Sequence, residues 1–108
     1  MALRVYVVAP DEKLSEGMTR AFAYFKSVAA VVCAIVLPPN EKLGRDLVQS
    51  IADGVQHCKQ IRRLGLVHSS PVVGFIAASS VLLCPSVEIR SFASEQSLRE
   101  AWPDRDSG

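Results

Sequence analysis

The sequence of 108 residues lacks most of the features that identify a functional class directly. No segment approaches the ~20 consecutive apolar residues of a membrane-spanning helix, because the longest apolar run, Val28–Leu37, is about half that length. Pro10–Lys13 interrupts the apolar start of the chain too early for a secretory signal peptide. We therefore expect a cytosolic protein without a membrane span.

A surplus of charge of either sign is also missing. The formal net charge is +1, charged residues make up 21% of the chain, and the basic residues are scattered. Binding to nucleic acid or to an anionic membrane surface relies on clustered basic charge. We therefore expect no nucleic-acid partner.

The cysteines and glycines form none of the spacings that hold a metal or a cofactor. Cys33, Cys58 and Cys84 contain no C-x-x-C pair, which argues against a zinc ribbon or a thioredoxin-type redox site. No G-x-G-x-x-G fingerprint or phosphate loop is present, so we expect no cofactor and no metal. His57 precedes Cys58, but neighbours on a helix point about 100° apart, which disfavours a catalytic pair.

What the sequence does contain is a regular alternation of short β-branched runs and longer amphipathic segments. The runs are Leu3–Val8, Val28–Leu37, Arg63–His68 and Val87–Phe92. This alternation predicts a single layered α/β domain with about four mostly parallel strands covered by about four helices. We place the domain at residues 1–103 and a disordered polar tail at 104–108.

The patterning of individual segments predicts where they lie. The continuous run Val31–Leu37 is typical of a central strand covered on both faces, whereas the alternating Val87–Phe92 favours an edge strand. Asn40 is expected to cap a long helix, whose apolar stripe is spaced by four residues. That stripe consists of Leu43, Leu47, Ile51 and Val55. For Val72–Leu83 the apolar pattern allows either a helix or a strand.

One polar cluster lies where a ligand could bind. His68, Ser69 and Ser70 follow a strand and precede an expected helix, at the carboxyl edge of the sheet. Open α/β sheets bind ligands at that edge, and free N–H groups at a helix start attract anions. The same Ser70, followed by Pro71, also reads simply as a helix cap. Both an anion or ligand site and a purely structural cap remain open.

The end of the chain is similar to a known family. Val87–Trp102 contains a strand, a phenylalanine, a short acidic turn and a helix that ends in alanine and tryptophan. This stretch resembles the ending of STAS-like proteins related to anti-sigma factor antagonists. The resemblance implies a STAS-like strand–helix repeat and a regulatory role without catalysis.

Two departures from that family pattern have consequences. Antagonists controlled by phosphorylation carry a serine-containing turn before their long helix, but Leu37–Gly44 contains no serine or threonine. Phosphorylation control at this place is therefore not expected. The family's second N-terminal strand is also missing, or is replaced by the single run Leu3–Val8.

We therefore expect a small, non-catalytic regulatory or interaction module that binds a protein partner or itself as a homodimer. Tyr24 on the first helix and the loop residues Asn40, Glu41 and Lys42 are the candidate interface. The alternative is a flavodoxin-like enzyme or ligand-binding subunit with its site at His68–Ser70.

Overall fold

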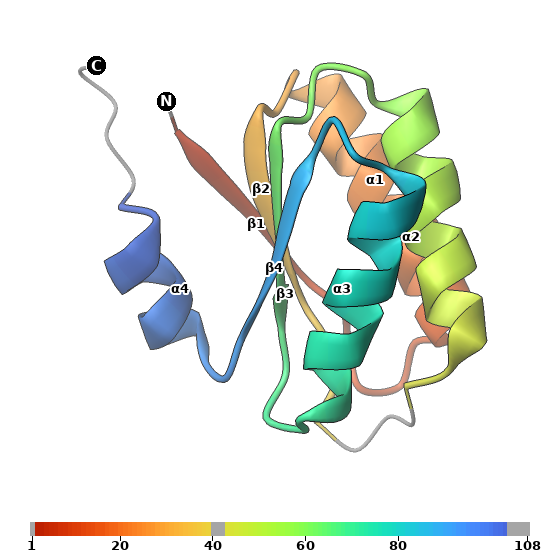
Figure 1. The fold of residues 1–108 in the computed structure, drawn as a ribbon, viewed down its shortest axis with the longest axis vertical. Coiled ribbons are helices and arrows are strands. Elements are labelled where there is room, and N and C mark those ends of the chain that lie inside the picture. The colour runs from red at the N-terminus through yellow and green to blue at the C-terminus, as the bar shows by residue number, and fades with distance from the viewer. Residues whose placement is uncertain (1, 40–42, 104–108) are drawn as a thin grey trace.

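The computed structural model describes residues 2–39 and 43–103, in which strands and helices alternate regularly (Figure 1). The strands are β1 (Leu3–Val7), β2 (Val32–Val36), β3 (Arg63–Val67) and β4 (Glu88–Phe92). The helices are α1 (Leu14–Ser27), α2 (Arg45–His57), α3 (Val72–Leu83) and α4 (Glu95–Ala101). The expected tail, 104–108, lies outside the described residues.

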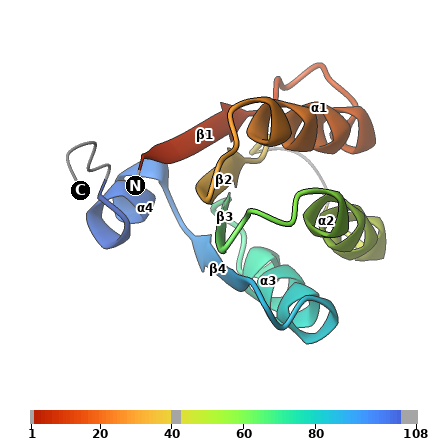
Figure 2. The same cartoon turned by 90° about the horizontal axis from the view of Figure 1, so that it is seen from above.

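The four strands form one parallel sheet in the order β1-β2-β3-β4, which is also their order along the chain. Because parallel crossovers are right-handed, successive connections pass over the same face of such a sheet. Helices α1, α2 and α3 accordingly cover one face, and α4 lies on the other (Figure 2). The predicted α/β layout with four parallel strands is confirmed.

The strand patterns correspond to positions in the sheet. β2 lies between β1 and β3, which explains why its sequence is apolar on both faces, and β4 is an edge strand. On the face beneath α1–α3, the main core includes Cys33, Ile35, Leu64 and Leu66, all fully buried. This large cluster is the principal source of apolar burial in the fold.

A second, smaller core lies beneath α4. Gly65 faces this helix, and a Cβ atom at that position would lie 3.0 Å from Leu98 Cδ1 and 3.2 Å from a ring carbon of Trp102. The missing side chain thus lets α4 pack closely on β3. The Trp102 ring meets Phe92 edge-on, with ring centroids 5.1 Å apart. At the start of α4, Ser94 Oγ accepts the Ser97 N–H at 3.1 Å, as expected for a serine cap.

Two expectations about helices are settled. The prediction that the second helix begins after Asn40 is wrong, because α2 begins at Arg45 with Gly44 at the N-cap position. Glycine is tolerated at an N-cap, and its carbonyl accepts the Leu47 N–H at 3.1 Å. The ambiguous segment Val72–Leu83 is a helix of 12 residues.

Candidate functional site

His68 follows β3 and ties two loops together at the carboxyl end of the sheet. It is buried, with 6% of its surface exposed. The Ser70 N–H lies 2.9 Å from its Nδ1, and a backbone N–H can only donate, so Nδ1 accepts. The proton is therefore on Nε2, which donates to the Pro38 carbonyl oxygen at 3.1 Å. Both ring nitrogens serve the fold, which leaves neither open to a ligand in this arrangement.

The two serines that follow differ in their surroundings. Ser69 is exposed, whereas Ser70 Oγ accepts the Val72 N–H at 3.3 Å and its carbonyl accepts the Val73 N–H at 3.2 Å. The Gly74 N–H is bonded to the Pro71 carbonyl oxygen at 3.1 Å. The first N–H groups of α3 thus have partners within the chain. A ligand role for His68–Ser70 stays a prediction, and the contacts seen are those of a helix start.

The expected interface residues are divided between a half-buried site and a segment outside the structure. The Tyr24 ring packs between Tyr6 and Phe25, with ring centroids 6.3 and 5.7 Å away. Tyr24 therefore supports the contact of α1 with the edge strand β1 as well as facing solvent. Residues 40–42, which include Asn40, Glu41 and Lys42, lie outside the described residues.

A cleft of about 380 Å³ runs between α1 and α2. It is lined by Met18, Thr19, Phe22, Ala23, Lys26, Ser50, Asp53, Gly54, His57 and Cys58. At its end, His57 Nδ1 lies 2.7 Å from the Asp53 carbonyl oxygen, and the Cys58 thiol donates to the Phe22 carbonyl oxygen at 3.5 Å. Burial raises the pKa of the Cys58 thiol, and Lys26 opposes this rise. Histidine and cysteine therefore each bond to the backbone, and the thiol is protonated at neutral pH.

The outer surface of α3 is the most unusual surface of the described chain. Among the described residues, five large apolar side chains are exposed, and four of them lie on this one helix. These four, called the α3 stripe below, are Val72 (41% exposed), Phe75 (75%), Leu82 (83%) and Leu83 (54%). Exposed apolar side chains that gather on one element mark interaction sites more often than isolated ones.

The inner side of the same helix packs into the main core. Val73, Ile76 and Ala77 are buried there, and Ser80 Oγ is satisfied by the Ile76 carbonyl oxygen at 2.7 Å. No charged residue occurs anywhere between Val72 and Leu83. The helix is thus uncharged and, apart from Ser79 and Ser80, apolar on both its buried and its solvent-facing sides.

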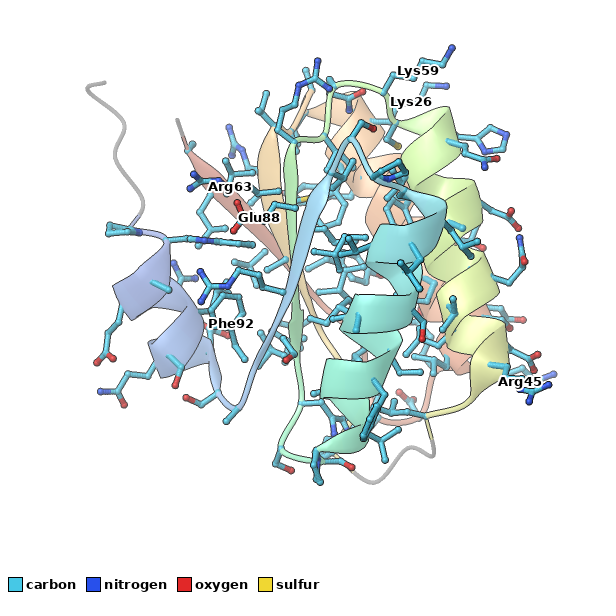
Figure 3. All side chains as sticks on the ribbon, in the orientation of Figure 1. Lys26, Arg45, Lys59, Arg63, Glu88 and Phe92 are labelled. Carbon is cyan, nitrogen blue, oxygen red and sulfur yellow. The ribbon has the colours of Figure 1, made fainter. Side chains whose placement is uncertain are left out.

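On the opposite face of the sheet, charged and aromatic side chains gather beside α4 (Figure 3). Glu88 Oε1 lies 3.5 Å from Arg63 Nε, and its Oε2 lies 3.9 Å from Arg90 Nη1. The guanidinium carbon of Arg63 is 5.9 Å from the Trp102 ring centroid, and that of Arg90 is 5.4 Å from the Phe92 centroid. The three charged side chains are about half-exposed, so each of their pairs contributes less than about 1 kcal/mol, whereas Phe92 and Trp102 are buried.

Other kinds of site find no support in the described chain. Across residues 2–39 and 43–103, no group of three or more His, Cys, Asp and Glu side chains is placed to hold a metal ion. In the same part of the chain, no helix combines the length and apolar character needed to cross a membrane. No protein-family model, curated protein or solved structure matches this chain.

Sequence reasoning did not identify the α3 stripe as a surface. The available signal was the uniformly apolar composition of Val72–Leu83, which ordinarily indicates a buried helix. Periodicity could not separate the inner from the outer positions, because both carry valine, leucine, isoleucine or phenylalanine. Only the position of α3 in the structure shows that Phe75 and Leu82 have no cover among the described residues.

Proposed function

We propose that this protein is a small, non-catalytic regulatory module that acts by binding a protein partner, either a different protein or a second copy of itself, through the α3 stripe. The observation that carries the proposal is the exposure of Phe75 and Leu82 on a helix without any charge. A side chain of this size that stays in water forgoes about 1.5–3 kcal/mol of favourable burial, which a partner could recover. The resemblance of Val87–Trp102 to STAS-like proteins would imply the same kind of role.

The polar groups of the described chain support an interaction role over catalysis. His68 uses both ring nitrogens in loop contacts, and the buried Cys58 thiol is protonated. A general base needs a free nitrogen, and a cysteine nucleophile needs a thiolate. To act as a base in the flavodoxin-like alternative, His68 would have to give up at least one of its two hydrogen bonds.

A binding experiment with matched variants tests the proposal. Immobilised wild-type protein is compared with a Phe75→Ser/Leu82→Ser variant and with a Gln49→Ser/Gln56→Ser control on the exposed side of α2. We expect one defined protein from the source lysate to bind the wild type and the control. The stripe variant should retain less than about a tenth of that binding, because hot-spot side chains contribute about 2 kcal/mol or more each.

Two outcomes would contradict the proposal. Equal retention of the partner by the stripe variant would overturn it, provided that the urea unfolding curve of that variant matches the wild type. Turnover of a small substrate that disappears in Ser70→Ala, with the fold retained, would instead favour the enzymatic alternative.

A further inference from the structure

We infer that two copies of this chain pair antiparallel along β4, about a twofold axis at Ile89, with their α3 helices side by side. This inference rests on the proposed function and names the partner of α3 as a second copy. It is carried by three features of one edge of the molecule: unused backbone groups, a self-complementary charge pattern and an uncharged helix. Figure 2 shows β4 and α3 together at this edge, away from β1.

The backbone of β4 presents hydrogen-bonding groups to solvent. The Glu88 N–H bonds to the Arg62 carbonyl oxygen at 2.9 Å, and the Phe92 carbonyl oxygen accepts the His68 N–H at 3.0 Å. Backbone groups alternate between the two sides of a strand, so Ile89 and Ser91 point their N–H and C=O groups away from β3. In the described chain, β4 pairs with β3 alone.

A twofold axis requires the two β4 strands to run antiparallel. When the axis passes at Ile89, this residue faces its own copy and the two exchange a pair of N–H···O=C bonds. Ser91 then faces Val87 of the second copy and can donate its N–H to that carbonyl. The Val87 N–H is already bonded to the Cys84 carbonyl oxygen at 3.1 Å, so this register leaves it in place. Together the two exchanged bonds and the two symmetric Ser91 bonds extend the sheet across the axis.

The charge pattern favours this register. Glu88 and Arg90 flank Ile89 on the same face of β4, and both are about half-exposed. With the axis at Ile89, each Glu88 lies opposite Arg90 of the second copy, which gives two attractive cross-strand pairs. A shift of the axis to Arg90 would instead place two guanidinium groups opposite each other. Charges on an edge strand usually prevent pairing, but here opposite signs are arranged to permit one register.

Helix α3 extends the same interface. A Cβ atom at Gly74 would lie 3.8 Å from Ser91 Oγ, so this side of α3 faces β4. Ala78 and Leu82 follow at four-residue spacing and continue that side toward the edge, with exposed Phe75 beside them. Two such helices across the axis would meet without any like-charge repulsion. A specific interface generally buries at least about 1,200 Å², and the helices add apolar area to the short strand pair.

Charge-reversal variants test the register directly. Sedimentation velocity over a range of concentrations should show a dimer for the wild type. Glu88→Arg and Arg90→Glu should each weaken dimerisation by about tenfold or more, because each variant places like charges opposite each other. An equimolar mixture of the two variants should restore the dimer, since the two arginines of one copy then lie opposite the two glutamates of the other. No contact within one copy can produce that recovery.

The remaining outcomes separate the two proposals. A wild-type chain that stays monomeric at every concentration, or a mixture that does not form the heterodimer, overturns the inference. A dimer that is insensitive to both charge reversals but is lost in Leu82→Ser also overturns it, because α3 alone would then form the contact. If the chain is monomeric and yet a stripe-dependent protein is captured, the inference fails while the proposed function stands. Urea unfolding of each variant verifies that its fold is retained.

Discussion

Helices α2 and α3 lie side by side on the same face of the sheet, yet the solvent-facing side of α2 is polar and that of α3 is mostly apolar. Both bury an apolar side in the main core, with Ile51 on α2 and Ile76 on α3. On the outside, α2 presents Gln49 and Asp53, whereas α3 presents Phe75 and Leu82. The comparison leads us to expect that the fold depends on the inner side of each helix, while the outer apolar side chains of α3 lack cover among the described residues.

The largest expected losses of stability test whether the inner sides of α2 and α3 contribute equally to the free energy of unfolding. Ile51→Ala and Ile76→Ala should each lower the free energy of unfolding by about 2–5 kcal/mol, because each leaves a cavity in the same core. Gln49→Ala and Leu82→Ala on the outer sides should change it by less than about 0.5 kcal/mol. Urea unfolding at low protein concentration measures all four. A loss of several kcal/mol in Leu82→Ala would show that α3 uses its outer side for folding, and the comparison would fail.

A smaller effect is expected where the two helices begin. α2 begins after Gly44 without a side-chain cap, whereas the start of α3 is held by His68. His68→Ala should lower the free energy of unfolding by about 1–3 kcal/mol, since the Pro38 carbonyl and the Ser70 N–H lose their partner. Urea unfolding of the variant beside the wild type measures the difference.

The exposed neighbour provides a matched control for this change. Ser69→Ala should leave the urea midpoint nearly unchanged. A His68→Ala variant that instead loses binding of a small anion, with stability unaltered, would support the ligand-site hypothesis for His68–Ser70.

The smallest effect concerns the cysteines, two of which lie at the ends of α2 and α3. Burial raises the pKa of the Cys33 thiol well above its ordinary value of 9.0, and Cys58 raises it further. Above about pH 9 the unfolded chain releases this proton while the folded chain keeps it, so stability falls as pH rises. The loss should approach about 1.4 kcal/mol per pH unit for Cys33.

Urea unfolding at several pH values between about 8 and 10 measures this slope. Cys33→Ala should make the fall of the unfolding free energy with pH less steep, because the contribution of the Cys33 thiol is removed. This holds whatever the stability of the variant at neutral pH. Burial also raises the pKa of Cys58 and Cys84, so a residual slope should persist. An identical slope in the wild type and in Cys33→Ala would show that the thiol titrates in the folded state.

The sequence predicted the fold better than the site. The alternation of β-branched runs with amphipathic segments was sufficient for four parallel strands, and the continuous run Val31–Leu37 correctly indicated an internal strand. The expected cap at Asn40 was wrong because glycine can begin a helix without a side-chain oxygen. The hydrogen bond of His68 to Pro38 joins residues 30 positions apart, and a local sequence pattern cannot predict such a contact.

The sequence by itself determined the layered architecture and most element types, because periodicity records which side of a segment is apolar, but it left Val72–Leu83 open between helix and strand. It could not determine that α4 crosses to the other face, or that α3 occupies the last position beside the edge strand β4. In α3 both sides are apolar, so pattern alone could not distinguish the buried Ile76 from the exposed Phe75. Tertiary packing determines which side of α3 is buried, because the sheet can cover only one side of each helix that packs on it.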